Sequence, residues 1–239
     1  MSESVLITGA NKSIGFESAR RLGEAGYRVW LGARDAARGQ AAAETLSALG
    51  QDVRFLQLAV DDEASVQAAA DRVTREDGKL DALINNAAIP GSYAEPIDET
   101  LADIRHVYDV NVFGPIAVTK AFLPLLQAAG SANVVNVSSG LGSLSLMADQ
   151  SYPFYGANLL GYNSSKAALN GVTISLAKAL APLGIRVNSA NPGYVKTDFN
   201  GHRGHRSVEE AAEIIVRLAT AGADGPTGGF FDDEGVLAW

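Results

Sequence analysis

The chain has 239 residues, no cysteine and a formal net charge of −8 at pH 7. This acidic balance argues against a nucleic-acid partner, because phosphate contacts need clustered lysines and arginines. A chain without cysteine has neither disulfides nor a thiolate nucleophile. No apolar run approaches the ~20 residues that span a bilayer, and the first residues show no signal-peptide pattern. We therefore expect a cytoplasmic protein with no membrane partner.

Apolar runs alternate along the chain with helix-like stretches, the pattern of a parallel sheet covered by helices. The predicted strands are Val5–Thr8, Arg28–Gly32, Val53–Val60, Ala82–Asn85, Asn133–Ser138, Ile185–Ala190 and Gly229–Phe231. The predicted helices are Ile14–Ala25, Asp35–Leu49, Asp61–Glu76, Asp98–Ala129, Gly161–Ala181 and Ser207–Ala221. Pro115 and Pro124 should bend or break the longest of them. The sequence predicts one α/β domain over residues 1–239, a doubly wound parallel sheet of Rossmann type with helices on both faces.

The first predicted strand runs directly into "TGANKSIG" (8–15), which opens the first helix. Backbone N–H groups at such a helix N-terminus can bind a pyrophosphate, with one glycine for the tight turn and another for close packing of the helix. The segment resembles the T-G-x-x-x-G-x-G loop of the short-chain dehydrogenase/reductase family, with a serine in place of the middle glycine. The resemblance implies cofactor contacts from Gly9, Asn11, Lys12, Ser13, Ile14 and Gly15. A crossover whose glycines serve geometry alone is the alternative.

The segment "LGARD" after the second strand indicates which dinucleotide binds. Arg34 stands where a base would bind the ribose 2′-phosphate, since its planar fork can hold two phosphate oxygens. Lys12 adds a second positive charge, and Ala33 replaces the aspartate usual in NAD-dependent members of the family. We therefore predict NADP(H), preferred over NAD(H). Alternatively, Arg34 pairs with Asp35 or Glu44 on the surface and Lys12 is simply solvated.

Three further segments resemble cofactor-binding motifs of the same family. "DALINNAA" (81–88) is similar to its N-N-A-G segment, and "NPGYVKTD" (191–198) to its P-G segment. In "LAVDD", Ala59 replaces an aspartate that often lies near the adenine. The resemblance implies additional cofactor contacts from Val60, Asp61, Asn85, Ala87, Pro192, Gly193, Val195 and Thr197.

The segment "YNSSKAAL" (162–169) places a tyrosine and a lysine four residues apart. On a helix such residues project from one face, so Tyr162 and Lys166 can reach the same cleft. A phenol with a pKa of ~10 exchanges protons poorly at neutral pH, and a nearby ammonium should lower that pKa. Taken alone, such a pair is usually a packed ring and a solvated amine. "DVNVFG" (109–114) and "NVVNVSSG" (133–140) resemble family motifs as well and add Asn111 and Ser139, the second of two serines.

The resemblance covers nearly the whole chain and implies a catalytic set of Asn111, Ser139, Tyr162 and Lys166. Tyr162 would give a proton to a carbonyl oxygen as hydride reaches the carbon, and Ser139 would donate a hydrogen bond to that oxygen. Lys166 would hold the nicotinamide ribose, with Tyr162 also beside the cofactor, and Asn111 would hold a water linked to Lys166. The expected activity is reversible, NADPH-dependent reduction of a small ketone or aldehyde to an alcohol.

Other interpretations of the sequence stay open. A non-catalytic dinucleotide-binding sensor could share the fold. A dehydratase or dehalogenase variant should alter the tyrosine–lysine pair or the phosphate loop, and only the loop is altered. The residues between Ser139 and Tyr162 predict a loop beside the substrate pocket. Such insertions obstruct the tetramer contacts of some relatives, so both a monomer and a homo-oligomer are possible.

The segment near 197–207 is predicted to be a short substrate lid. Its two histidines, His202 and His205, could contact substrate or be solvated. They lie three residues apart with no cysteine or carboxylate beside them, which is too little for a metal site. We therefore predict no metal.

Overall fold

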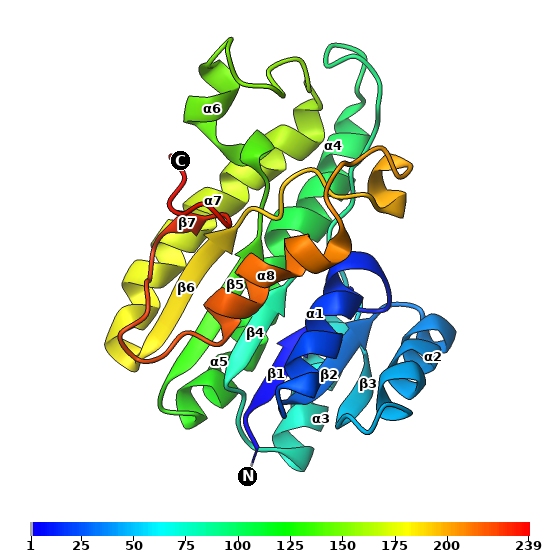
Figure 1. Ribbon diagram of the computed structural model, residues 1–239, viewed down its shortest axis with the longest axis vertical. Coiled ribbons are helices and arrows are strands. Elements are labelled where there is room, and N and C mark those ends of the chain that lie inside the picture. The colour runs from blue at the N-terminus through cyan, green and yellow to red at the C-terminus, as the bar shows by residue number, and fades with distance from the viewer. Residues whose placement is uncertain (1) are drawn as a thin grey trace.

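The computed structural model describes residues 2–239 and contains one seven-stranded sheet (Figure 1). All of its pairings are parallel, in the order β3-β2-β1-β4-β5-β6-β7. The strands are β1 (Ser4–Ile7), β2 (Arg28–Ala33), β3 (Val53–Gln57), β4 (Ala82–Asn85), β5 (Ala132–Val137), β6 (Ile185–Ala190) and β7 (Phe230–Phe231). The predicted fold class is confirmed.

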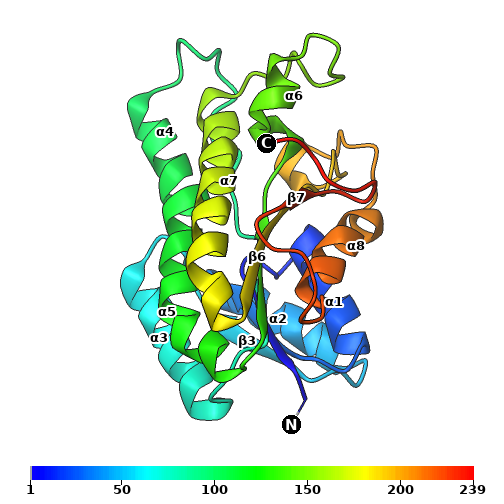
Figure 2. The same ribbon diagram turned by 90° about the vertical axis from the view of Figure 1, so that its left-hand side faces the viewer.

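Helices cover both faces of this sheet. They are α1 (Ser13–Glu24), α2 (Ala36–Ser47), α3 (Glu63–Glu76), α4 (Leu101–Tyr108), α5 (Gly114–Ala128), α6 (Leu144–Ala148), α7 (Leu160–Leu180) and α8 (Val208–Ala219). In Figure 2, α1, α2 and α8 lie on one side of the sheet and α3, α4, α5 and α7 on the other. The strand order reverses between β1 and β4. In such sheets this switch point, at the carboxyl ends of the strands, is where ligands bind.

The strands carry nearly continuous apolar runs because both of their faces are buried. Successive side chains point to opposite faces, so Leu6 joins one apolar core with Trp30 and Phe122. Its neighbours Val5 and Ile7 join the second core, against α1, α2 and α8. The two cores hold the sheet rigid between its helical layers and fix where each strand ends.

The predicted long helix 98–129 begins later than expected and contains a widened turn. Thr100 caps α4 by accepting a hydrogen bond from Asp103 N at 3.1 Å. A π-helical turn, Asp109–Phe113, joins α4 to α5. Pro115 lies in the first turn of α5, and Pro124 lies inside α5 without ending it. Neither proline therefore ends the helical stretch, and the helical pitch changes locally at the π turn instead.

The continuous helical stretch Leu101–Ala128 has the length and mean hydropathy of a membrane-crossing helix, unlike the expectation from the sequence. In this fold 56% of its most apolar window is buried. It packs against α3 and α7 and forms part of the first core.

Two other boundaries differ from the predictions. The third strand ends at Gln57, because Ala59 N turns to donate to Ser65 Oγ at 3.0 Å. The stretch after β5 contains a 3-10 turn, Gly140–Gly142, followed by α6. A capping box opens α8, with Ser207 and Glu210 bonded to each other's backbone.

Candidate active site

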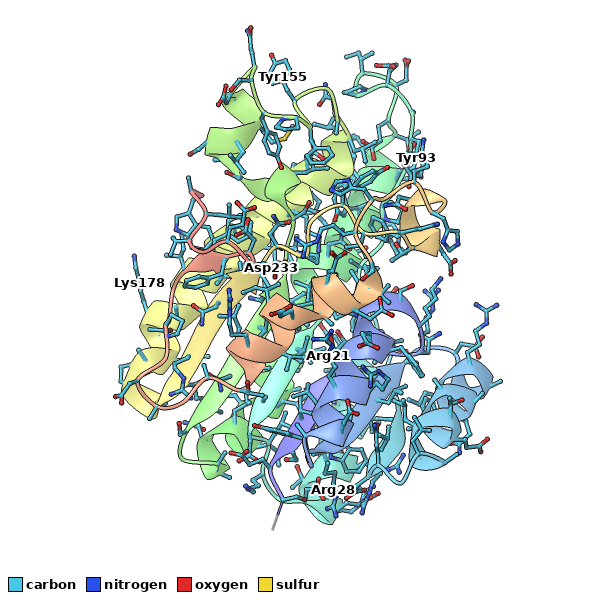
Figure 3. The ribbon with its side chains drawn as sticks, viewed as in Figure 1. Arg21, Arg28, Tyr93, Tyr155, Lys178 and Asp233 are labelled. Carbon is cyan, nitrogen blue, oxygen red and sulfur yellow. The ribbon has the colours of Figure 1, made fainter. Side chains whose placement is uncertain are left out.

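Four chain segments gather at the carboxyl edge of the sheet, the upper edge in Figure 1. They are the loop between β1 and α1 and the segments that follow β4, β5 and β6. Figure 3 labels Tyr93 and Tyr155 on the two long loops that rise above this edge. All predicted site residues except Asn85 lie in these segments, in the first turn of α1, just after β2 and β3, in the π turn or on α7.

Two glycines of the phosphate loop are required by close backbone contacts. Gly9 has a φ of +63°, and a Cβ there would lie 2.9 Å from the Cα of Ala87. A Cβ on Gly15 would lie 2.5 Å from Asn86 Nδ2 and 2.8 Å from the Gly9 carbonyl oxygen. The tight turn and the close approach of the helix therefore have the geometry expected from the sequence.

Ser13 adopts a left-handed backbone conformation with a φ of +52°. This region costs an L-residue roughly 1–2 kcal/mol relative to glycine. The substitution of serine for the family's glycine is therefore accommodated with backbone strain, and its hydroxyl stands at the start of α1. The N-terminus of α1 has no side-chain cap and no acidic residue in its first turn.

Thr8 and Asn86, which the sequence analysis did not single out, connect the phosphate loop to the end of β4. Thr8 Oγ1 accepts from the backbone N–H groups of Asn86 at 2.9 Å and Ala87 at 3.0 Å. Asn86 Nδ2 donates to the carbonyl oxygens of Thr8 at 2.8 Å and Gly9 at 3.1 Å. The signal for this contact was a polar residue at the end of each of two strands that flank the switch point.

Asn85 does not face the cofactor site, contrary to its assignment as a cofactor contact. It is 3% exposed and donates to Asn136 Oδ1 at 2.9 Å and Thr119 Oγ1 at 3.2 Å. Because successive strand residues point to opposite faces, Asn86 turns toward the loop while Asn85 turns into the core. The role of Asn85 is to join β4, β5 and α5.

Lys12 forms an ion pair that the sequence did not suggest. Its Nζ lies 2.9 Å from Asp198 Oδ2, in the segment after β6, and both side chains are exposed. His202 Nε2 lies 2.9 Å from the other oxygen of Asp198. The pair links the phosphate loop to the predicted lid, so Lys12 is neither simply solvated nor reserved for a phosphate.

Arg34 is exposed at the end of β2. Its two alternative partners are engaged elsewhere: Asp35 caps α2 and faces Arg38 at 3.7 Å, and Glu44 accepts from Gln40 Nε2 at 2.9 Å. Arg38, not singled out from the sequence, lines a hollow between the loop and α2 with Asn11 and Lys12.

The remaining cofactor candidates surround this loop. Val60 is buried against Gly114, whereas Asp61 is exposed. Asn191 Oδ1 accepts from Gly140 N at 3.0 Å and from Gly193 N at 3.1 Å, so one amide fixes the ends of both β5 and β6. The P-G segment continues into Val195 and Thr197, both buried.

Of the two serines at the end of β5, only Ser139 meets the tyrosine. Its side chain lies near enough to the Tyr162 phenol to oppose the rise in the pKa of that group, and its Oγ accepts from Leu141 N at 3.2 Å. Ser138 is buried and donates to Asn170 Oδ1 at 2.7 Å, on the opposite side of the strand. The geometry thus places the two serines in different surroundings, and the catalytic role of Ser139 stays a prediction.

Tyr162 and Lys166 lie on the same face of α7. Lys166 Nζ is 5.7 Å from the centroid of the tyrosine ring and donates to the Val137 carbonyl oxygen at 2.8 Å. Burial raises the pKa of Tyr162 to about 12, although the side chain of Ser139 opposes this shift. Burial also lowers the pKa of Lys166 to about 7. The expected lowering of the Tyr162 pKa by the ammonium is therefore wrong for this geometry, because desolvation dominates.

Asn111 lies in the π turn and is fully buried. Its Oδ1 accepts from Ile89 N at 2.9 Å, and its Nδ2 donates to the Ile89 carbonyl oxygen at 3.0 Å and to Ser165 Oγ at 3.1 Å. Both amide hydrogens are used within the protein, and the water expected between Asn111 and Lys166 stays a prediction. Asn111 anchors the segment after β4 to α7.

Aromatic side chains from the loop after β5 and the segment after β6 pack together beside Ser139. We call Tyr152, Phe154, Tyr194 and His205 the aromatic wall. Ring centroids in the aromatic wall are 5.6 Å apart for Tyr152–Phe154 and for Phe154–Tyr194, and 6.5 Å apart for the nearly parallel Phe154 and His205. The Tyr152 hydroxyl lies against Gly140, the residue after Ser139. The wall therefore flanks the site.

A second aromatic contact lies on the tyrosine itself. The ring of Phe199 packs edge-on against Tyr162 at 5.5 Å between centroids. Tyr93 donates its hydroxyl to the Phe199 carbonyl oxygen at 2.7 Å. The segment that contains Phe199 folds back on itself, because Lys196 N donates to the Arg206 carbonyl oxygen at 2.8 Å.

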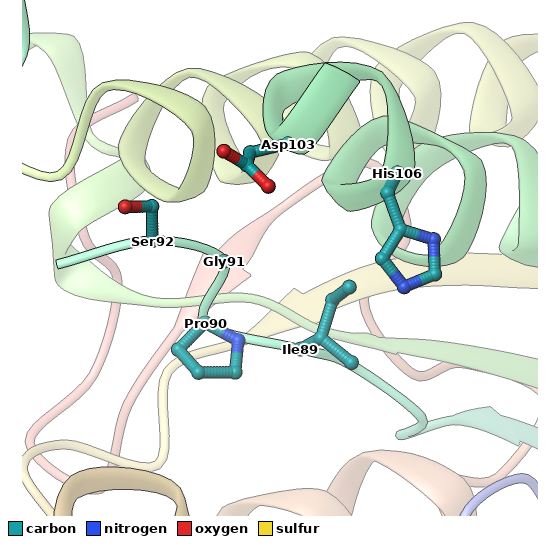
Figure 4. Close-up of a pocket in the computed structure, with 6 residues that line it drawn as sticks. All are labelled: Ile89, Pro90, Gly91, Ser92, Asp103 and His106. Carbon is teal, nitrogen blue, oxygen red and sulfur yellow. The ribbon is translucent and has the colours of Figure 1, made fainter. Parts of the chain in front are cut away.

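Another hollow lies between the 89–92 segment and α4, where Asp103 and His106 face Ile89, Pro90 and Ser92 (Figure 4). It contains none of the predicted catalytic side chains. Within residues 2–239, no cluster of three or more His, Asp or Glu side chains could hold a metal ion.

Comparisons with known proteins agree with this geometry. A family model described as short chain dehydrogenase matches residues 3–207. The chain is 37% identical to short-chain dehydrogenase anuI of Penicillium roqueforti, covering 98% of this chain and 95% of the relative. It is 34% identical to (+)-neomenthol dehydrogenase of Arabidopsis thaliana, covering 97% and 96%.

Among solved structures, NADPH-bound carbonyl reductase from chicken fatty liver superimposes with a TM-score of 0.87 at 32% identity, covering 100% of this chain and 99% of that one. These matches agree with the order of loop, serine, tyrosine and lysine along the chain. The chain belongs to the short-chain dehydrogenase/reductase family of oxidoreductases.

Proposed function

We propose that this protein is an NADPH-dependent reductase of ketones or aldehydes that acts reversibly on small molecules. The observation that carries the proposal is the juxtaposition of three side chains: Ser139 adjoins the Tyr162 phenol, and the Lys166 amine lies 5.7 Å from the tyrosine ring centroid. These three groups lie at the carboxyl edge of the sheet, next to a glycine-bounded loop. The order of these groups argues for catalysis over a non-catalytic sensor.

The residues present fit a dinucleotide phosphate. The N-terminus of α1 has neither a side-chain cap nor an acid in its first turn, which suits a pyrophosphate. Arg34 is exposed at the end of β2, and Arg38 and Lys12 line the neighbouring hollow. With alanine rather than an acid at position 33, Arg34 and Arg38 favour a 2′-phosphate over a free ribose hydroxyl. The related chicken carbonyl reductase was solved with NADPH.

The chemistry follows from the protonation states. A bound nicotinamide supplies the hydride that reaches the carbonyl carbon. Negative charge then grows on the carbonyl oxygen, where Ser139 can donate a hydrogen bond and Tyr162 a proton. Because burial raises the Tyr162 pKa to about 12, the phenol is protonated at neutral pH, the form that reduction needs. The pKa of Lys166 is lowered to about 7, so the amine is partly protonated. A neighbouring hydroxyl or phosphate that accepts its hydrogen bonds would favour the protonated form.

The aromatic wall supports a bulky, largely apolar carbonyl substrate. Aromatic faces provide large apolar contact areas with few internal rotations to immobilise. A relative at 34% identity is named for neomenthol, a cyclic alcohol. We therefore propose cyclic or aromatic ketones as the preferred substrate class.

The test is NADPH oxidation, followed at 340 nm, against a panel that runs from acetone and butanal to substituted cyclohexanones and acetophenones. The proposal expects turnover, higher kcat/KM for the ring-bearing ketones, and tighter binding of NADPH than of NADH. Replacing Phe154 with alanine should raise KM for the cyclic ketones and leave the small aldehydes nearly unchanged. Intact NADPH binding without turnover on the whole panel would instead favour the sensor.

A further inference from the structure

The first turn of α7, which carries Tyr162, lacks the usual means of satisfying its backbone donors. A helix leaves its first N–H groups without partners inside the helix, and the residue at the N-cap normally supplies a side-chain acceptor. Here the N-cap is Leu159, whose side chain accepts nothing. The helix therefore needs an acceptor from another part of the chain.

Glu99, at the end of the segment after β4, supplies that acceptor. Its Oε2 accepts the N–H of Gly161 at 2.8 Å, and the side chain is only 9% exposed. A carboxylate at a helix N-terminus is stabilised by the helix dipole. Thr100, the next residue, caps α4, so the backbone that carries Glu99 is itself held by secondary structure.

The carboxylate fits tightly between two glycines. A Cβ on Gly161 would lie 2.7 Å from Glu99 Oε1, and a Cβ on Gly91 would lie 3.5 Å from the same oxygen. Oε1 is buried and has no hydrogen-bond partner within the described residues. A buried group with an unused oxygen is costly for stability alone. Capping a single N–H therefore gives no sufficient reason for a carboxylate at this buried position.

The position of Glu99 suggests a further reason. Gly161 directly precedes Tyr162, whose own carbonyl oxygen accepts from Ser165 Oγ at 2.7 Å. The segment that bears Glu99 also carries Tyr93, which holds the Phe199 carbonyl oxygen at 2.7 Å, and Phe199 packs on the Tyr162 ring. One segment thus contacts the backbone of the residue before Tyr162 and the backbone of Phe199, whose ring packs on the tyrosine.

We propose that Glu99 is a positioning residue for Tyr162: its carboxylate fixes the first turn of α7 and thereby holds the phenol against Ser139. It touches neither substrate nor cofactor in this account. The inference rests on the proposed reductase activity, since its principal readout is turnover by Tyr162. A displacement of about 1 Å at a reacting group can lower the rate about 100-fold.

The first experiment compares Glu99→Ala with Glu99→Gln. Alanine removes the acceptor, and kcat should fall about 10- to 100-fold while the Kd for NADPH changes less than about threefold. Glutamine keeps an oxygen for the Gly161 N–H and should retain kcat within about threefold. Asp81→Ala is the matched control: Asp81 Oδ2 accepts Ser4 N at 2.7 Å at the opposite edge of the sheet. This control should lower Tm and leave kcat unchanged.

A second variant keeps the inference testable if Glu99→Ala folds poorly. Gly161→Ala improves helix propensity but drives a methyl group into Glu99 Oε1, so kcat should fall while Tm holds or rises. In the Glu99→Ala background the same change should have no further effect, because coupled residues are not additive. Unchanged kcat in Gly161→Ala, or additive losses in the double variant, would overturn the inference.

The two proposals fail in different ways. If the wild-type protein turns over none of the carbonyl panel, the proposed reductase activity is wrong. If the wild type is active and Glu99→Ala loses stability but keeps its kcat, Glu99 is only a structural cap.

Discussion

The phosphate loop and the substrate side of the site are held in shape by different kinds of interaction. The loop over residues 8–15 is shaped by its own backbone: positive φ at Gly9 and Ser13, and a close approach at Gly15. The substrate side is assembled from side chains far apart in the chain, such as Glu99 on Gly161 and Tyr93 on Phe199. A local backbone motif tolerates few residue types, whereas a long-range assembly of side chains can change its substrate while keeping its scaffold.

The largest effect is expected from breaking the backbone side of this comparison with Gly15→Ala. The added Cβ would lie 2.8 Å from the Gly9 carbonyl oxygen and 2.9 Å from the Ala10 Cα, which are backbone atoms that cannot rotate away. Overpacking of this kind costs about 1–3 kcal/mol, so NADPH binding measured by fluorescence titration should weaken about 10- to 100-fold. Gly171→Ala, where a Cβ meets nothing within 4 Å, is the control and should bind normally. Equal affinities for both variants would contradict a backbone-defined loop.

The side chains of the substrate side are tested by comparing how the stability of the wild type and of Lys166→Met depends on pH. Since burial lowers the Lys166 pKa to about 7 from 10.5, the folded state loses this proton between pH 7 and 9 while the unfolded state keeps it. The unfolded state then binds more protons, so the free energy of unfolding rises with pH. Relative to Lys166→Met, the wild type should gain about 2 kcal/mol from pH 7 to 9, measured by urea denaturation. Parallel curves for the two proteins would show that the amine is not desolvated.

A smaller effect, on the free energy of unfolding, is expected from Ser13→Gly in the phosphate loop. Ser13 has a φ of +52°, so Ser13→Gly relieves a backbone strain of about 1 kcal/mol, partly offset by the greater entropy of glycine in the unfolded chain. A gain of about 0.5 kcal/mol in the free energy of unfolding is expected from thermal or chemical denaturation. The control is Ser175→Gly, an exposed serine inside α7, which should lose about 0.5 kcal/mol. A loss in both variants would mean that the Ser13 conformation carries no strain.

The same contrast explains how far the sequence could predict this molecule. Apolar runs predicted every strand of the sheet, with ends that differ by at most three residues, because strands buried on both faces carry a strong local signal. The glycine geometry of the loop and the choice of Ser139 over Ser138 also followed from local motifs. Asn85 was misassigned because adjacent strand residues face opposite sides, and the motif did not show which side holds the cofactor.

Long-range contacts could not be derived in this way. Nothing near Lys12 in the sequence indicates Asp198, and nothing near Leu159 indicates that Glu99 completes its helix. The direction of the Tyr162 pKa was also mispredicted, because the degree of burial depends on the packing of several loops. Such properties arise from tertiary structure and need coordinates.

The most direct test of the central claim is turnover and cofactor binding in Tyr162→Phe, measured in the same samples with a cyclic ketone from the panel. Phenylalanine keeps the ring against Phe199 and removes only the hydroxyl that can give up a proton. The account predicts that kcat falls at least about 100-fold while the Kd for NADPH stays within about threefold of wild type. Wild-type kcat in Tyr162→Phe would contradict the assignment of Tyr162 as the proton donor.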